Sequence, residues 1–152
     1  SEAEGLGARA QAQPLEAQAA LRAALDLREA LYGIFSARAQ GGEIPPRDLA
    51  CLNRALGEAL PNLGLEAQGQ ALVWRWRREV PDLGSPLWPL ARAAADLLTA
   101  TAAAPVRECG GAQCTWLFLD QSRGRSRRWC SMASCGNRAK ARRHYHRGRQ
   151  KP

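Results

Sequence analysis

The sequence predicts a mainly α-helical N-terminal domain with one small β-hairpin, followed by a compact four-cysteine module. Apolar residues recur at helical spacing over most of the first hundred residues, and this spacing gives way to alternation near residues 63–78. Four of the five cysteines then lie in two matched pairs after residue 105. A chain of 152 residues is long enough for a medium domain and a small module. We therefore expect a helical domain over residues 14–105 and a cysteine module over residues 106–152.

Two long helices are expected to begin the domain. Residues 1–13 are small and polar without apolar periodicity, so they are predicted to be a flexible leader. Helical spacing starts at Pro14 and continues until the Gly41–Gly42 pair. The Pro45–Pro46 pair turns the chain into a second helix, which Pro61 ends. Both apolar stripes are interpreted as core.

A hairpin and a third helix complete the predicted domain. Apolar and polar residues alternate near residues 63–78, which is the period of a strand. Trp74 and Trp76 would share one face, which we expect to pack on the helices rather than to bind a ligand. Ser85 supplies a capping hydroxyl and Pro86 suits the first helical position, so a third helix is expected to start there.

The two cysteine pairs predict a structural zinc site. Their spacing is Cys-x(4)-Cys, fifteen residues, Cys-x(4)-Cys, which places two chelating loops around a hairpin. Four thiolates close the coordination sphere, whereas a catalytic zinc keeps an open position. An iron–sulfur cluster also takes four cysteines, but symmetric pairs favour zinc. The fifth cysteine, Cys51, lies in a Leu-rich helical pattern and is interpreted as core. The expected ligands of one Zn²⁺ are Cys109, Cys114, Cys130 and Cys135.

The residues between and after the pairs suggest how the module folds. An apolar strand from Thr115, a polar turn and a second short strand would return the chain to the third cysteine. Trp116, Phe118 and Trp129 are expected to cover the cluster, with base stacking by one of them as the alternative. Asn137 would cap a C-terminal helix. A knuckle, a hairpin and a helix that holds the last ligands resemble a treble-clef zinc finger.

Charge is distributed unevenly along the chain. Residues 106–152 hold twelve Lys and Arg against two acids, a net charge of +10, whereas residues 1–105 hold ten Arg against twelve acids, a net charge of −2. Such a cationic segment attracts polyanions. It has no apolar helical face for a lipid surface, and no apolar run spans a bilayer or forms a signal peptide. We expect a cytoplasmic, nucleoid-associated protein, and the excess of Arg over Lys hints at a high-GC bacterial genome.

The basic residues are the candidate DNA contacts. Arginines on the hairpin and cations on the outer surface of the C-terminal helix could meet phosphates and guanine edges. The alternative is that arginines near the ligands neutralise the thiolates, and this alternative applies most to Arg138. His144 and His146 lack a ligand spacing, and no catalytic constellation stands out, so we do not expect an enzyme. The candidate contacts are Arg123, Arg125, Arg127, Arg128, Arg138, Lys140, Arg142, Arg143 and Arg147.

Three motifs carry a family resemblance. The segments Phe118-Leu119-Asp120-x-Ser122, Ser126-Arg127-Arg128-Trp129-Cys130-Ser131-Met132 and Cys135-Gly136-Asn137-Arg138-Ala139-Lys140 are similar to the CGNR zinc finger. That finger follows a helical ABATE domain in bacterial stress-induced transcription regulators, and residues 14–105 resemble ABATE more loosely. The resemblance implies zinc at the four paired cysteines and DNA binding by the basic module. Family members carry a further segment before the first long helix, so the N-terminal segment of this chain is expected to be shortened.

Together these observations predict a transcription regulator. Its zinc finger would bind duplex DNA, and its N-terminal domain would sense an unidentified signal or effector, or associate with a second copy. The alternatives are an RNA-binding zinc module, an adaptor whose finger docks an acidic protein, and a redox switch that loses zinc when its thiolates oxidise.

Overall fold

The computed structural model describes residues 2–77, 82–100 and 104–149, with side chains described for 4–77, 82–100 and 104–145. The chain forms two compact units. The N-terminal unit comprises Ser1–Ile34 and Pro45–Thr101, and the C-terminal unit comprises Phe35–Ile44 and Ala102–Pro152. The second unit therefore includes a segment, residues 35–44, that the sequence analysis placed in the helical domain.

The N-terminal unit is mainly helical, as expected. Its helices are α1 (Glu2–Ala12), α2 (Pro14–Gln40, of which residues 14–34 belong to this unit), α3 (Pro46–Ala59) and α4 (Leu87–Thr99). The starts of α2 and α3 at their prolines agree with the fixed φ of proline at a first helical position. Helix α4 starts where expected, but Ser85 makes no capping hydrogen bond, and the N-cap residue is Pro86.

Helix α1 contradicts the expectation of a flexible leader. The segment from Glu2 to Ala12 has no strong apolar stripe, which is why periodicity missed it. Four of its eleven residues are Ala and two are Glu, which have high intrinsic helix propensity, whereas Gly5 and Gly7 oppose a helix. Propensity therefore gives partial support to a helix that hydrophobic patterning did not indicate.

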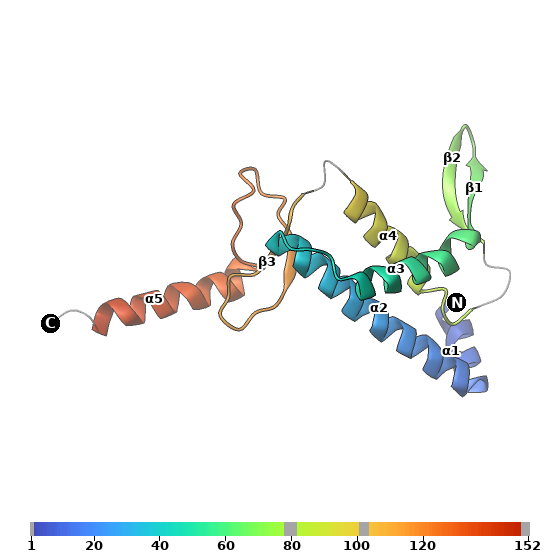
Figure 1. Cartoon of the computed structure of the whole chain (residues 1–152), viewed down its shortest axis with the longest axis horizontal. Coiled ribbons are helices and arrows are strands. Elements are labelled where there is room, and N and C mark those ends of the chain that lie inside the picture. Colours follow the sequence, from blue (N-terminus) through green and yellow to red (C-terminus); the bar gives the residue numbers. More distant parts are fainter. Residues whose placement is uncertain (1, 78–81, 101–103, 150–152) are drawn as a thin grey trace. The chain divides into compact units, whose positions relative to one another are not determined.

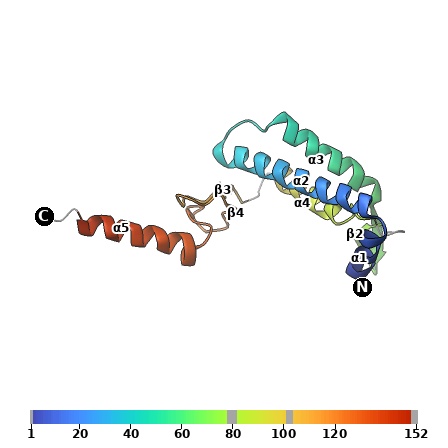
Figure 2. The ribbon, with the colours of Figure 1, turned by 90° about the horizontal axis from the view of Figure 1, so that it is seen from below.

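Three helices build the apolar core of the N-terminal unit. Helices α2, α3 and α4 lie side by side in two perpendicular views (Figures 1 and 2). Ile34 and Ala91 are fully buried between them, and Leu52 is 2% exposed. A methyl group on Gly33 would collide with the Asp48 carboxylate, so glycine allows α2 and α3 to approach closely. The core side chains are Leu27, Ala30, Ile34, Leu52, Ala59, Trp88, Ala91 and Ala94.

The predicted hairpin is present. A short 3-10 turn, Leu60–Asn62, leads into β1 (Leu63–Gln68), which pairs antiparallel with β2 (Ala71–Trp76). The two-residue loop contains Gly69 at φ +63°, a left-handed conformation that glycine adopts without steric cost.

The hairpin packs on the helices less completely than expected. Trp76 lies 6.0 Å from Trp88 of α4, measured between ring centroids, so one of the two tryptophans does pack on a helix. Trp74 remains 59% exposed, and the Arg92 guanidinium lies over its ring at 5.1 Å from the centroid. The apolar face of the hairpin is thus partly open to solvent.

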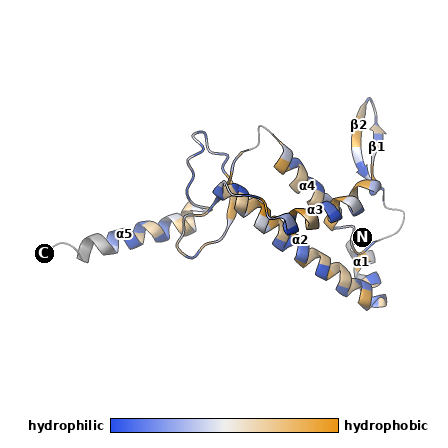
Figure 3. Cartoon of the chain, in the orientation of Figure 1, coloured by the Kyte–Doolittle hydropathy of each residue, from blue (hydrophilic) through white to orange (hydrophobic). Residues whose placement is uncertain are grey.

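The C-terminal unit contains a short hairpin and a basic helix. Strand β3 (Val106–Glu108) pairs antiparallel with β4 (Leu117–Leu119), and a π-helical turn, η2 (Met132–Gly136), continues into α5 (Asn137–Arg149). The expected hairpin between residue 115 and Trp129 is wrong, because β4 pairs with the strand before the first cysteine pair. Figure 3 shows α5 as mainly hydrophilic over its described side chains. No helix in the described ranges is long and apolar enough to cross a membrane.

Candidate metal centre and basic surface

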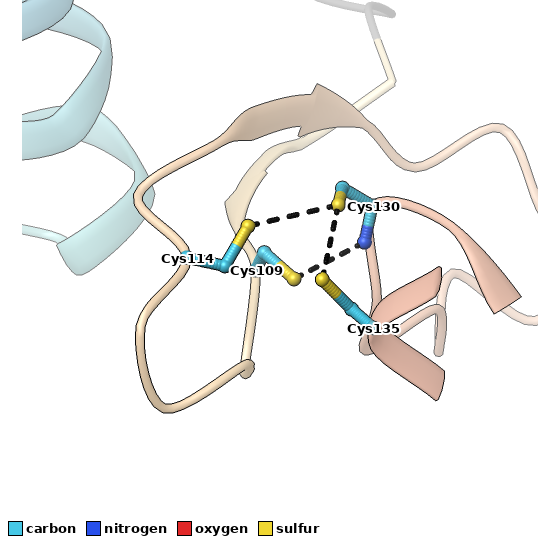
Figure 4. A group of neighbouring side chains, drawn as sticks. All are labelled: Cys109, Cys114, Cys130 and Cys135. Atoms are coloured by element: carbon cyan, nitrogen blue, oxygen red, sulfur yellow. Dashed lines mark hydrogen bonds between the residues drawn. The ribbon is translucent and has the colours of Figure 1, made fainter. Parts of the chain in front are cut away.

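The four paired cysteines converge on one point. Their Sγ atoms all lie within 4.8 Å of one another (Figure 4). The Sγ of Cys130 lies 3.8 Å from that of Cys114 and 3.7 Å from that of Cys135. Four sulfurs at about 2.3 Å from a tetrahedral zinc are about 3.8 Å apart, so these separations match the edges of a ZnS₄ site. They are too long for disulfides, whose sulfurs lie about 2.05 Å apart. The cysteines form a zinc-binding site for one structural ion.

The first pair is held by the loop that joins β3 to β4. The Cys109 amide donates to the Trp116 carbonyl at 2.9 Å, and the Cys114 amide donates to the Gly111 carbonyl at 3.0 Å. Gly111 lies directly against the sulfurs, since a methyl group there would be 3.1 Å from Cβ of Cys114 and 3.4 Å from Sγ of Cys135. A methyl group at this position would crowd Cys114 by a few tenths of an ångström, so glycine lets this knuckle close around the sulfurs without a shift.

The second pair is held at the start of the terminal helix. The Ser131 hydroxyl accepts a hydrogen bond from the Ser134 amide at 3.3 Å and caps the π-helical turn that contains Cys135. The expected cap at Asn137 is wrong, because Asn137 already has helical φ and ψ of −67° and −40°. Helix α5 starts at Asn137, and the last ligand lies in the π-helical turn directly before it.

Arginine and backbone groups compensate the charge of the thiolates. Arg138 donates to Sγ of Cys135 at 3.1 Å, and this contact lowers the pKa of Cys135 to about 7. Burial raises the pKa of Cys130 to about 12. The pKa of Cys114 is also raised, because burial and the neighbouring cysteines outweigh the hydrogen bond with the Trp116 backbone that lowers it. Zinc must therefore displace protons from the buried thiols when it binds. The contact of Arg138 with Cys135 supports the alternative role anticipated for this arginine, serving the metal site.

A buried carboxylate organises the segment between the pairs. Asp120 is fully buried and accepts hydrogen bonds from the Ser122 hydroxyl at 2.6 Å and from the Arg127 amide at 3.0 Å. Arg107 forms an ion pair with it at 3.0 Å. Burial alone would raise the pKa of Asp120, but these partners together lower it. The Ser122 amide also donates to the Asp120 carboxylate, at 3.1 Å, which closes an Asx turn.

Two of the aromatic residues expected over the cluster carry cations instead. The Arg127 guanidinium lies 4.8 Å from the centroid of Phe118 and donates to the carbonyls of Trp129 and Cys130. Arg128 lies 5.0 Å above the ring of Trp129. Trp116 is 72% exposed, so its expected place in a small core is wrong.

The structure separates the predicted basic residues into groups. Arg127 and Arg138 are engaged in the scaffold, as described above. Arg128, Arg138, Arg142 and Arg143 line one cleft, whereas Arg123, Arg125 and Lys140 lie outside it. The side chain of Arg147 lies outside the described residues. On α5 itself, Ala141 is exposed and Tyr145 is 59% exposed.

Sequence reasoning missed three residues that build this unit. Arg107 was considered only as a neighbour of the ligands, yet it joins Asp120 and also donates to the Arg125 carbonyl at 2.6 Å. Gln40 donates to Glu108 at 3.0 Å, and no sequence signal connects residues so far apart. Gly111 could have been found from its position inside the first chelating loop.

Comparison with protein families agrees with this architecture. A model described as CGNR zinc finger matches residues 106–148, and the ABATE model, described as "Putative stress-induced transcription regulator", matches residues 2–101. No curated protein matches the chain. The ABATE match covers more than half of the chain and confirms the resemblance noted from the sequence. The chain therefore belongs to the ABATE family of putative stress-induced transcription regulators and carries a CGNR zinc finger.

Proposed function

We propose that this protein regulates transcription by binding duplex DNA through the basic surface of its C-terminal unit. The observation that carries this proposal is uncompensated positive charge. Only three acids occur in the described part of the unit: Glu43, Glu108 and Asp120. Asp120 is buried with Arg107, and Glu108 bonds to Gln40. In the described part of this unit, the exposed cations whose side chains have neither a carboxylate partner nor a hydrogen bond are Arg38, Arg123, Arg125, Arg128, Lys140, Arg142 and Arg143.

The zinc site gives this surface its shape. Because Arg138 and the Asp120 network compensate charge inside the unit, the remaining cations are free to meet phosphates. A rigid array of guanidinium groups can contact several phosphates at once, and each contact releases counterions. A regulator of this kind would act in the cytoplasm, on the nucleoid.

The salt dependence of DNA binding tests the proposal. The zinc-loaded full chain should bind a duplex with an affinity that falls steeply as salt rises. Arg142→Ala and Arg143→Ala should each reduce the logarithmic slope by about 0.9, the value for one lost phosphate contact. Arg47→Ala is the matched control, because Arg47 is an exposed arginine of the N-terminal unit. Unchanged slopes for both C-terminal variants would contradict this interface.

The same binding assay distinguishes duplex DNA from RNA and from an acidic protein as the target. Duplex DNA, single-stranded DNA and structured RNA of equal length should be compared at one salt concentration. A preference for structured RNA would replace DNA by RNA as the target. Weak binding to all three, with a stable acidic protein partner recovered by pull-down, would indicate an adaptor.

We further propose that the N-terminal unit associates with a second copy through its hairpin. Cross-strand pairing places Leu65 opposite Trp74 and Ala67 opposite Leu72, so these residues share one face. Leu65, Leu72 and Trp74 are 56%, 69% and 59% exposed. An isolated two-stranded hairpin is marginally stable in water, so a partner for this face would stabilise it. A cavity of about 300 Å³ between α2, α3 and α4 is the alternative, a site for a small effector.

Sedimentation equilibrium tests this association. The wild-type chain should form a dimer, and Leu72→Lys should shift it to monomer. Gln68→Lys is the control, since Gln68 is exposed on the opposite face of the same hairpin. A monomeric wild type would leave signal sensing as the role of this unit.

A further inference from the structure

A basic cleft lies beside the zinc site within the C-terminal unit. Its volume is about 320 Å³. One wall is the loop of residues 110–113, and the opposite wall is the start of α5. Its cationic and aromatic lining residues are Arg128, Trp129, Arg138, Arg142 and Arg143.

The charge inside this cleft is not cancelled by the protein. A zinc ion with four thiolates carries two net negative charges, and Arg138 is already bonded to one of these thiolates. No acid lines the cleft. Arg128, Arg142 and Arg143 form no ion pair or hydrogen bond from their side chains within the described chain. Cys114 and Cys135 also line the cleft, so its four arginines carry four positive charges against the two negative charges of the zinc site. Two net positive charges therefore remain, and no described residue of the cleft neutralises them.

The cleft is shaped before any ligand arrives. Arg128 is held over the ring of Trp129 at 5.0 Å, and its carbonyl accepts a hydrogen bond from the Gly110 amide at 3.0 Å. A methyl group on Gly110 would lie 3.2 Å from both Cγ and Nε of Arg128, so this side chain packs directly on the loop. Arg138 and Arg142 are four residues apart and share one face of α5. Because Arg128 is held in place, its guanidinium loses little entropy when it binds an oxyanion.

We propose that this cleft is a phosphate-binding site, in which Arg128, Arg142 and Arg143 hold the oxygens of one phosphate group. Planar guanidinium forks match phosphate geometry and form bidentate, charge-assisted hydrogen bonds. Where the phosphate is a phosphodiester of duplex DNA, this inference rests on the proposed function and names the contact that fixes the finger on the backbone. The same chemistry would also accept a free phosphate ester, and the two sources are distinguished by experiment.

The test uses the zinc-loaded full chain labelled with ¹⁵N. Amide resonances of the 110–113 loop and arginine Nε–Hε resonances are followed during titration with inorganic pyrophosphate and, separately, with a 16-base-pair duplex. Both ligands should shift the loop amides and the Arg128 and Arg142 resonances. Metal content is measured after each titration, so that zinc removal by pyrophosphate is detected.

A pair of glycine variants provides the matched comparison. Gly110→Ala should displace Arg128 and weaken binding of both ligands about tenfold, the loss of one charge-assisted contact. Gly124→Ala is the control, because a methyl group there meets only the Ser126 hydroxyl, at an ordinary 3.5 Å. Both variants should retain one zinc per chain, which shows that the metal site still folds.

The outcomes separate this inference from the proposed function. If the duplex binds but shifts only Arg123 and Arg125, and Gly110→Ala binds as tightly as wild type, the cleft proposal is overturned and DNA binding stands. If pyrophosphate shifts the cleft while no duplex binds, the cleft stands as a site for a free phosphate ester and the proposed function fails. If neither ligand shifts the cleft, the proposal is overturned.

Discussion

The two units of this protein are stabilised by different physical means. The N-terminal unit buries Leu, Ile, Ala and Trp side chains between three helices, which is the usual hydrophobic solution. In the described C-terminal unit, the buried residues are Cys109, Cys135, Asp120 and Gly136, and its aromatic residues are only partly covered. A unit with so little apolar burial depends on zinc and on the Asp120 network for its fold. Folding of the C-terminal unit is therefore coupled to zinc binding, whereas folding of the N-terminal unit depends on hydrophobic burial.

Removal of one zinc ligand should have the largest effect on stability, and it should unfold one unit and leave the other folded. Cys130→Ser is expected to lose zinc and to unfold residues 106–152, while the N-terminal helices stay folded. Metal analysis and residue-resolved hydrogen exchange measure both consequences. Cys51→Ser is the control thiol change outside the cluster. Equal loss of hydrogen-exchange protection in both units would mean that zinc stabilises the N-terminal unit as well.

Truncation of a core side chain in the N-terminal unit should destabilise that unit and leave the zinc site intact. Leu52 is 2% exposed, so Leu52→Ala should lower the free energy of unfolding of this unit by about 2–5 kcal/mol through lost burial and a cavity. Zinc affinity should not change. Denaturant unfolding gives the first quantity and a competition titration with a chelator gives the second. A parallel loss of zinc affinity would mean that the units fold as one.

Loss of the arginine that supports the ligands should weaken the metal site without destroying it. Arg138→Ala removes the hydrogen bond to Cys135 at 3.1 Å, and changes to groups that support metal ligands lower metal affinity by about 10–100-fold. Chelator competition measures this loss. Arg123→Ala removes an exposed arginine away from the sulfurs and should leave the affinity unchanged. Equal affinities for wild type and Arg138→Ala would assign Arg138 to DNA instead.

The smallest expected effect is the pH dependence of the Asp120 network. The folded unit lowers the pKa of Asp120 below its ordinary 3.8, so the charged carboxylate stabilises the fold above that pH and loses this effect as pH falls through the lowered value. The difference in thermal midpoint between wild type and Asp120→Asn should thus be greatest near neutral pH and shrink in acid. Acid also releases zinc, but it does so in both wild type and Asp120→Asn, so this contribution largely cancels in the difference between their thermal midpoints. Glu108→Gln is the control, and a difference that is constant with pH would contradict the mechanism.

Strong local signals allowed most of the fold to be predicted. Prolines and glycines define α2 and α3, alternation defines the β1–β2 hairpin, and cysteine spacing defines the zinc ligands, because each acts over a few residues. The errors share a different cause. Trp116 is expected inside because it is large and apolar, but the described part of this unit has no core large enough to cover it.

Partners distant in sequence also escaped prediction. The pairing of β3 with β4 and the bond between Gln40 and Glu108 depend on tertiary closure, which no local pattern reports. The cleft beside the zinc site has the same origin, since its walls come from residues 110–113, Arg128 and α5.

The position of Cys135 in the π-helical turn directly before α5 affects how that helix forms. Helix initiation is unfavourable, and an isolated segment as short as the 13 residues of α5 is marginal in water. Its cations repel one another, which opposes the helix further. Zinc fixes the preceding turn around its fourth ligand and so supplies the nucleus that this sequence lacks. The metal would then act as a template for helix growth, and the ordered row of cations on α5 would exist only in cells with enough zinc to start it.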